Sequence, residues 1–302
     1  MKKKIICIIL LLGATVIWGS SFVSQRVAMD HMGPFTFQAT RCFMALIALF
    51  IGSFISDGVQ KKGAGFVARW TDKKLWKVGL LCGIPLFLAC NLQQVGLVDT
   101  DAGKSGFLTA MYIVFVPVIG IFLRKKVTFM VPVSVALAVV GMYFLSCFGV
   151  TSINTGDLLT LGCALMFAVQ ITFVDRLAQD LDALRLNAIQ CLVCTVLSAL
   201  VMVLTETPTW ESICVCIGPL FHVGVLSMGL GYFLQIVGQQ SLDATPATLI
   251  MSLESVFAAI FGVLLLNETM GGWEILGCCL IFIAVILSQI PVKTGKKVHS
   301  SN

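Results

Sequence analysis

The sequence carries one pattern twice, and this duplication decides the fold. The stretch NLQQVGLVDTDAGKSGFLTAMYIVFVPVIGIFLRKK, residues 91–126, aligns without a gap with FLQIVGQQSLDATPATLIMSLESVFAAIFGVLLLNE, residues 233–268. The offset is 142 residues, and ten of the 36 aligned positions are identical. Apolar identities are common between membrane segments, so we predict an internal repeat from the polar and glycine identities: Gln93 with Gln235, Gly96 with Gly238, and Asp101 with Asp243.

The composition is that of a membrane protein. Of the 302 residues, 58% are hydrophobic and 12% are charged, whereas a soluble domain carries about 25% charged residues. A bilayer core about 30 Å thick takes about 20 apolar residues per helix, so the chain can cross about ten times with short loops. This argues against a cytosolic enzyme, a secreted disulfide scaffold and a nucleic-acid binder, and nucleic acid is not an expected partner.

Apolar runs, interrupted by charge or by Gly, Pro and Asn, predict ten transmembrane segments. Each is expected to be helical because lipid offers the backbone no hydrogen-bond partner. The least certain boundaries lie near Lys104 and in the eighth segment, where Gly218-Pro219, His222 and Gly229-Leu230-Gly231 interrupt the run. The predicted fold class is an all-α membrane protein with ten transmembrane helices, at residues 5–23, 34–56, 75–96, 104–123, 129–147, 157–175, 184–204, 212–236, 244–266 and 273–290.

The duplication divides these ten segments into two groups of five. A weaker similarity at an offset near 149 pairs Gly13 with Gly162 and Arg41 with Gln190. The chain is then two five-helix repeats, residues 1–150 and residues 151–302, the second ending in a short basic cytoplasmic tail. Because five is odd, the second repeat enters the membrane in the opposite orientation. Such inverted repeats surround a site near the bilayer midplane and are typical of secondary transporters.

The basic residues indicate the orientation. Of the 20 Lys and Arg residues, 17 fall in the segments on the side of the two termini. The opposite side holds Arg26 and Lys104, and Arg41 lies inside the second segment. The positive-inside rule therefore predicts that both termini are cytoplasmic.

Two charged residues lie inside predicted spans. Glu254 is ten residues into the ninth segment, about 15 Å deep at 1.5 Å per residue, and Arg41 is seven residues into the second. A charge at such a depth is costly and needs a structural or a functional reason. We expect Glu254 to carry a proton or to contact a cationic substrate group, and Arg41 to contact a carboxylate or to pair with Glu254. The alternative is an ion pair or hydrogen bond that only holds the bundle together.

Further polar and aromatic residues at helical spacing are candidates for lining a cavity, although interhelical packing explains each of them as well. His222 is the only histidine inside a predicted span. It is a second candidate for proton coupling, and the alternative is a hydrogen bond to a backbone carbonyl freed by the neighbouring Gly218-Pro219. The cavity candidates other than Arg41 are Trp18, Gln25, Gln38, Tyr112, Gln170, Gln190, Tyr232 and Gln235.

No motif for a cofactor or a metal ion stands out. The twelve cysteines fall within or at the ends of the predicted spans, with no histidine or second cysteine pair at zinc spacing in a loop. We interpret them as small buried apolar residues. Gly103-Lys104-Ser105 lacks the first glycine of a phosphate-binding loop, because Val98 stands there. We therefore expect no catalytic residues, no cofactor and no metal.

Several short motifs together resemble the EamA-type members of the drug/metabolite transporter superfamily. The similarity covers nearly the whole chain and rests on five features taken together. One position departs from the family pattern: Asn267 stands where the family often has glycine. The resemblance implies transport of small metabolites, amino acids or drugs through a central cavity without ATP hydrolysis. The features are the ten spans in two repeats, Trp18-Gly19-Ser20-Ser21-Phe22, Pro34 with Arg41, Ala244-x-Pro246, and Leu265-Leu266-Asn267-Glu268.

The predicted function is secondary transport of a small organic metabolite, such as an amino acid, an amine or a drug-like solute. The protein is expected in the plasma membrane, as a multi-pass protein of the bacterial inner membrane, and to work by alternating access. Export follows from the resemblance alone, and proton coupling and facilitated diffusion both fit. The expected partners are the substrate and the lipid bilayer, and a homodimer is left open. The alternative is a membrane-embedded enzyme or a channel, although the sequence has no recognisable catalytic or filter motif.

Overall fold

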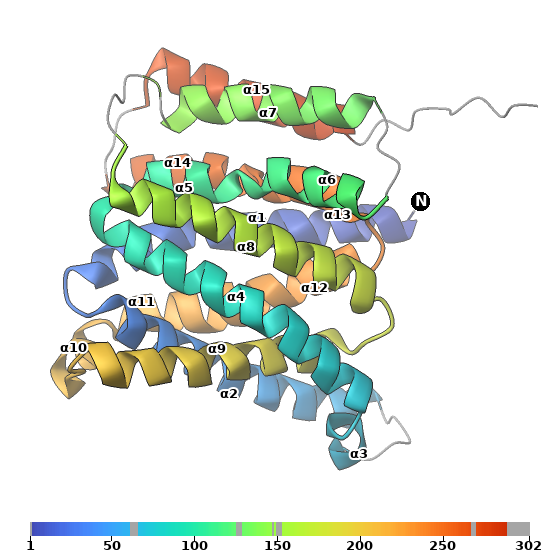
Figure 1. The fold of residues 1–302 in the computed structure, drawn as a ribbon, viewed down its shortest axis with the longest axis vertical. Coiled ribbons are helices and arrows are strands. Elements are labelled where there is room, and N and C mark those ends of the chain that lie inside the picture. The colour runs from blue at the N-terminus through green and yellow to red at the C-terminus, as the bar shows by residue number, and fades with distance from the viewer. Residues whose placement is uncertain are drawn as a thin grey trace, which may run out of the picture.

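The fold consists of long apolar helices that lie side by side (Figure 1). The computed structural model describes residues 2–60, 66–124, 129–146, 148, 153–266 and 270–288, and all secondary structure in these ranges is helical. Eight helices in the described ranges are long and apolar enough to cross a membrane, which makes the chain a multi-pass membrane protein. They are Lys3–Met29, Pro34–Val59, Lys73–Asp99, Ala102–Phe122, Thr155–Leu177, Ala183–Thr205, Ile217–Gln239 and Ala244–Leu265.

Each of these eight helices overlaps one predicted span. The predicted spans at 129–147 and 273–290 coincide, over their described residues, with two shorter apolar helices. The elements of the first half are α1 (Lys2–Met29), α2 (Pro34–Gln60), α3 (Phe66–Trp70), α4 (Lys73–Asp99), α5 (Ala102–Ala110), α6 (Tyr112–Phe122) and α7 (Met130–Ser146). Those of the second half are α8 (Thr155–Leu177), α9 (Ala183–Thr205), α10 (Trp210–Val215), α11 (Ile217–Phe221), η1 (His222–Gly231), α12 (Tyr232–Gln239), α13 (Ala244–Met251), α14 (Leu253–Leu266) and α15 (Gly272–Ser288).

Side-chain caps start several of the helices. The Asp72 carboxylate accepts from the backbone N–H of Lys74 at 2.8 Å at the start of α4. Asn154 and Asp157 form a reciprocal capping box at the start of α8. Such caps satisfy backbone donors that have no partner within the helix.

Two membrane helices are broken near the middle, at matching places in the repeat. One is divided into α5 and α6 at Met111, and the other into α13 and α14 at Ser252. Their starts, Ala102 and Ala244, are 142 residues apart, which is the offset of the sequence repeat. The predicted spans at 104–123 and 244–266 each match one candidate membrane span, and each contains a break that was not predicted from the sequence. Tyr112 is the first residue after one break and Glu254 is the second residue after the other.

The irregular eighth segment contains a π-helix, η1, between α11 and α12. Its span begins at Ile217, and α10 is a separate short helix, so the predicted start at residue 212 was five residues early. Side chains from other helices bond carbonyls of η1: the Trp18 indole donates to Ser227 at 3.4 Å, and the Asn187 amide donates to Met228 and Gly229 at 2.9 Å each. π-Helical turns often occur at functional sites.

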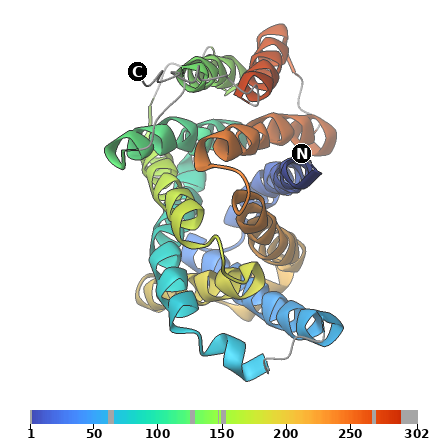
Figure 2. The same ribbon diagram turned by 90° about the vertical axis from the view of Figure 1, so that its right-hand side faces the viewer.

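The helices form a layered bundle. Helices α7 and α15 pack on each other at one edge, and α2 and α9 pack on each other at the opposite edge, as Figures 1 and 2 show. Between these edges lie α1, α4, α8 and the broken helices. The α7–α15 crossing is close, because a Cβ atom at Gly277 would lie only 2.5 Å from the carbonyl oxygen of Gly141.

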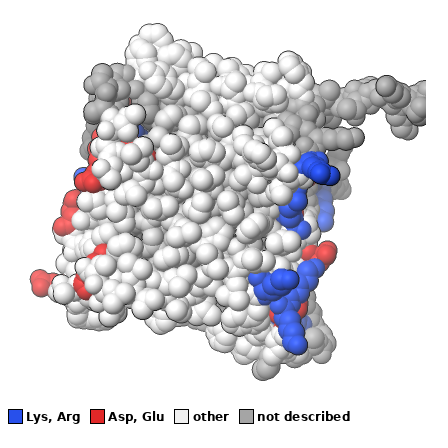
Figure 3. All heavy atoms as spheres, in the orientation of Figure 1, with Lys and Arg blue, Asp and Glu red and all other residues white. Residues whose placement is uncertain are grey.

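The charged side chains lie at the two ends of the helices. Figure 3 shows a broad uncharged band, with Lys and Arg concentrated at the end that carries the N-terminus and mainly Asp and Glu at the other. We call these the basic end and the acidic end. The basic tail residues Lys293, Lys296 and Lys297 lie outside the described residues.

Candidate functional site

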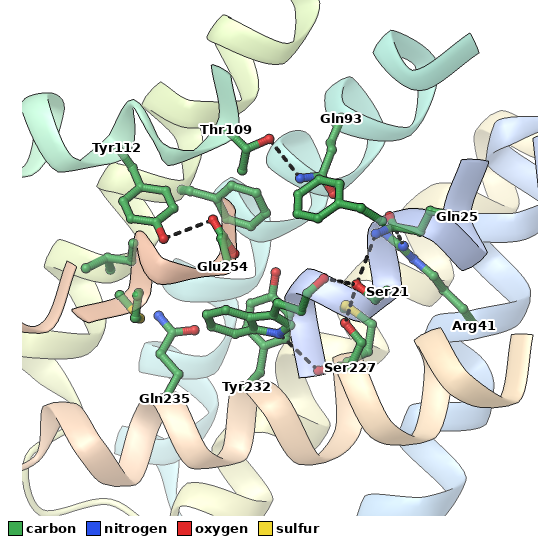
Figure 4. A pocket seen from close by; sticks show the side chains of 16 residues that line it. Ser21, Gln25, Arg41, Gln93, Thr109, Tyr112, Ser227, Tyr232, Gln235 and Glu254 are labelled. Atoms are coloured by element: carbon green, nitrogen blue, oxygen red, sulfur yellow. Dashed lines mark hydrogen bonds between the residues drawn. The ribbon is translucent and has the colours of Figure 1, made fainter. Parts of the chain in front are cut away.

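A cavity lies in the middle of the bundle, between the helices of both halves (Figure 4). The space between its lining side chains is about 490 Å³, with open solvent at its mouth included. Its lining combines two charged residues, several hydroxyl and amide groups, and aromatic rings: Trp18, Ser21, Phe22, Gln25, Arg41, Gln93, Thr109, Tyr112, Phe167, Ile171, Ser227, Met228, Tyr232, Gln235, Met251 and Glu254.

Glu254 supplies the acidic group of the cavity. Its side chain is 4% exposed, and its Oε1 accepts a hydrogen bond of 3.0 Å from the hydroxyl of Tyr112. Tyr112 and Glu254 occupy aligned positions of the sequence repeat, at the offset of 142 residues. The contact therefore joins the two broken helices just after their breaks.

Arg41 supplies the basic group of the cavity. It is 2% exposed, and its Nη1 donates to the side-chain oxygen of Gln25 at 2.6 Å. The Gln25 amide in turn donates to the hydroxyl of Ser21 at 3.3 Å. The guanidinium also stands over the Phe37 ring, 5.4 Å from its centroid, which is a favourable cation–π position.

The two buried charges do not pair with each other. Among the described residues no ion pair involves Arg41 or Glu254, so the predicted alternative of an Arg41–Glu254 pair was wrong: Gln25 and Tyr112 take the places of the two partners. Arg41 Nε is also buried without a hydrogen-bond partner among these residues. A buried charge with unused hydrogen-bonding capacity is costly unless another group supplies the partner.

Aromatic rings form one wall of the cavity. The Trp18 and Tyr232 rings lie 5.1 Å apart between centroids, and Phe167 lies 6.5 Å from Tyr232. Gly231 allows this arrangement, since a Cβ atom there would come within 2.6 Å of the Trp18 indole nitrogen. The wall gives the cavity an apolar side next to its two charged groups.

The structure brings seven of the predicted site residues together around the cavity and places four elsewhere. The residues in the lining are Trp18, Gln25, Arg41, Tyr112, Tyr232, Gln235 and Glu254, and those outside it are Gln38, Gln170, Gln190 and His222.

Three of the four outside residues are buried amides that bond to other buried side chains. Gln38 donates to the thiol of Cys42 at 3.1 Å. Gln170 donates to Gln190 at 3.0 Å and accepts from Gln235 at 3.2 Å. This links two of them to the cavity through Gln235.

His222 does not line the cavity, and among the described residues its ring bonds to side chains and not to a backbone carbonyl. Its two ring nitrogens lie 3.1 Å from the Ser20 hydroxyl and 2.8 Å from the Ser24 hydroxyl, both on α1. The predicted bond to a freed carbonyl was wrong, because the two serines of α1 present hydroxyl groups to the ring.

Some lining residues were not among the predicted site residues. Gln93, whose amide donates to Thr109 at 3.0 Å, is one of them. Its alignment with Gln235 in the repeat was the available signal. Ser227 lies in the π-helix and Met251 ends α13 at its break, two features that were not predicted from the sequence.

A multi-pass helical membrane protein with a cavity of charged, polar and aromatic side chains in the middle of its bundle is typical of the class of membrane transport proteins. The chain belongs to the EamA-like transporter family, whose model matches residues 5–147 and again residues 154–289. Each match covers one half of the molecule.

Named relatives are transporters as well. An uncharacterized transporter of Archaeoglobus fulgidus is 35% identical over 282 residues, covering 92% of this chain and 83% of that protein. The threonine/homoserine exporter RhtA of Salmonella typhimurium is 27% identical over 173 residues, 56% of this chain and 57% of the exporter. A crystal structure with a TM-score of 0.75 and 16% identity covers 94% of this chain and 96% of that one, and shows that the two share a fold.

Proposed function

We propose that this protein is a secondary transporter that carries a small zwitterionic metabolite, such as an amino acid, through the membrane by alternating access. The observation that carries the proposal is that two buried, oppositely charged side chains line one cavity, and each is bonded to a different neutral residue. Arg41 is bonded to Gln25, and Glu254 is bonded to Tyr112. A solute with a carboxylate and an ammonium group would supply each charge with its counter-ion.

The remaining lining fits such a solute. Arg41 Nε and Gln235 Oε1 are buried and have no hydrogen-bond partner among the described residues, so both are available to a bound carboxylate or ammonium. The rings of Trp18, Phe167 and Tyr232 offer an apolar surface for a side chain. The exporter of threonine and homoserine among the relatives supports an amino acid as cargo.

Alternating access requires two halves that can move against each other around the site. In the proposal, α7 and α15 also cross the membrane, which gives ten spans in two inverted five-helix repeats, residues 1–150 and 151–302. The matching starts of α5 and α13 and the contact between aligned residues Tyr112 and Glu254 support this. Inverted repeats are a common basis of such motion.

The proposal includes an orientation and a direction. The concentration of Lys and Arg at the end with the N-terminus supports a cytoplasmic basic end and residence in the plasma membrane (Figure 3). Export is favoured by the exporter among the relatives. Proton coupling would use Glu254, the one carboxylate in the cavity lining. An enzyme or a channel is less well supported, because the relatives are named transporters.

Flux into proteoliposomes tests the proposal. We expect unlabelled zwitterionic amino acids to compete with a radiolabelled amino acid at least about tenfold better than the matching amine or the matching carboxylic acid, because each analogue leaves one buried charge without a partner. Glu254→Gln is expected to lower flux and to abolish any effect of a pH gradient, while Glu211→Gln, at an exposed acid on α10, leaves both unchanged. Equal competition by the singly charged analogues would contradict a zwitterionic substrate, and no flux of any candidate would contradict transport.

A further inference from the structure

Helices α2 and α9 lie against each other in opposite directions, and each belongs to a different half of the molecule. At both ends of this helix pair, a carboxylate from the last turn of one helix, or just beyond it, contacts the first turn of the other. Asp57 of α2 and Glu206 after α9 provide these carboxylates.

Glu206 holds the start of α2 at the acidic end. Its carboxylate accepts from the backbone N–H groups of Phe35 and Thr36 at 2.9 and 2.8 Å, and from the Thr36 hydroxyl at 2.5 Å. Gly33 precedes the helix and has no capping side chain, and a Cβ atom there would lie 2.3 Å from the Glu206 carboxyl carbon. The other half therefore provides the cap that α2 lacks, and a carboxylate at a helix N-terminus is well placed electrostatically. We call this contact the outer clamp.

Asp57 holds the start of α9 at the basic end. Its two oxygens accept from Arg69 and from Nη2 of Arg185, and Nη1 of Arg185 donates to Asp182 at 2.6 Å. Arg185 is 1% exposed, with its guanidinium 5.6 Å from the centroid of the Trp70 ring. We call the contact between Asp57 and Arg185 the inner clamp.

The two clamps occupy equivalent positions in the sequence. The starts of α2 and α9, Pro34 and Ala183, are 149 residues apart, and so are Asp57 and Glu206. Each clamp thus joins the two halves at one end of the same helix pair. Arg41 of the cavity lies on α2 between the clamps.

We propose that the two clamps are the latches of alternating access, and that each face of the transporter opens when its own clamp breaks while the other stays closed. This rests on the proposed transport function. Both clamps are formed in this structure. In the part of the chain that the structure describes, each end has one further ion pair between the halves: Lys104 with Asp157 at the acidic end is largely buried and 2.5 Å long, whereas Lys74 with Asp180 at the basic end is exposed and 4.0 Å long. An exposed ion pair contributes little, so breaking the inner clamp takes less than breaking the outer one.

Hydrogen–deuterium exchange on the full chain in lipid nanodiscs tests the latches without using transport. Glu206→Gln removes the charge of the outer clamp, and Asp57→Asn removes that of the inner clamp. The matched controls are Glu211→Gln and Asp243→Asn, since both are exposed acids near the same ends and neither forms an ion pair among the described residues. Conservative amides keep the shape of each side chain, and Tm separates folded from unfolded variants.

If a clamp is a latch, removing its charge should speed hydrogen exchange in distant segments at the same end of the molecule. If the clamp only joins two helices, exchange should change only at the helix start that it contacts. For Glu206→Gln we expect about tenfold faster exchange at residues 34–37 and also at residues 20–29 of α1 and 91–99 of α4, which do not bond to Glu206. Asp57→Asn is expected to act instead at residues 183–187 and at residues 235–239 of α12, with a larger increase than Glu206→Gln. Faster exchange confined to the first turn of α2 or α9, or equal at both ends, would overturn the proposal. Absence of wild-type flux would overturn the transport function instead, so the two failures are distinguishable.

Discussion

The two halves of the molecule differ in charge at two pairs of aligned positions where the charged member lines the cavity. Glu254 of the second half aligns with Tyr112 of the first, and Arg41 of the first half aligns with Gln190 of the second. Each half therefore contributes one charge, and the aligned position in the other half is neutral. In the family-matched halves the framework is alike, with α7 packed on α15 and α2 packed on α9.

This difference explains how a duplicated fold can form a site for a solute that carries two unlike charges. A cavity with strictly equivalent residues would present two carboxylates or two guanidinium groups, which repel each other and match a solute with two like charges. One charge from each half gives the cavity an acidic and a basic group. In the proposed function the two charged positions select the solute, while the aligned residues Gln93 and Gln235 line the cavity from both halves.

The largest expected effect comes from removing the charge that only one half carries. Arg41→Ala is expected to raise KM for the transported amino acid by about tenfold to hundredfold, because a hydrogen bond to a charged group contributes about 1.5–3 kcal/mol. The measurement is initial flux against substrate concentration in proteoliposomes.

Its matched control is the aligned residue of the other half. Gln190→Ala is expected to change KM by less than about threefold, because Gln190 bonds to Gln170 outside the cavity lining. Equal changes in the two variants would contradict the functional asymmetry of the halves.

The next largest effect is expected at the crossing of α7 and α15, where one helix from each half packs on the other. Gly277→Ala places a Cβ atom 2.5 Å from the carbonyl oxygen of Gly141 and 2.7 Å from the backbone nitrogen of Leu145, so the helices must move apart. We expect a loss of about 1–3 kcal/mol in the free energy of unfolding, measured by thermal unfolding in detergent, with KM unchanged. Gly272→Ala has nothing within 4 Å of the added atom and is the control; an equal loss there would contradict the close crossing.

Much of the fold follows from the sequence, because lipid forces apolar segments of sufficient length into helices. The predicted spans overlap the eight long helices and the two shorter ones, α7 and α15, with bounds that differ by several residues. What hydropathy does not encode is how a helix is interrupted. The breaks at Met111 and Ser252 and the π-helix η1 depend on contacts with other helices, such as those of Trp18 and Asn187 with η1.

The site was less predictable than the fold. Helical spacing shows which residues share one face of a helix, but it does not show what that face packs against. Gln170 and Gln235 were both cavity candidates, yet only Gln235 lines the cavity, with Gln170 bonded behind it. The clamps were missed for a related reason. Asp57 and Glu206 lie near the ends of spans, where a charge is expected to be solvated, and only the pairing of α2 with α9 gives them partners.

The smallest expected effect compares two tyrosines of the cavity, one from each half. Tyr112 donates its hydroxyl hydrogen to Glu254 at 3.0 Å, whereas the Tyr232 hydroxyl lies 3.8 Å from the Cys90 sulfur. Tyr112→Phe is expected to change KM by about threefold to tenfold, because it removes a hydrogen bond that holds the carboxylate in place, while Tyr232→Phe changes KM by less than about twofold. Competition by the matching amine distinguishes the two variants further, because only Tyr112→Phe removes a hydrogen bond to the Glu254 carboxylate. A larger effect of Tyr232→Phe on either measurement would mean that the ammonium group binds at the aromatic wall, and Glu254 would then be a structural residue of the broken helices.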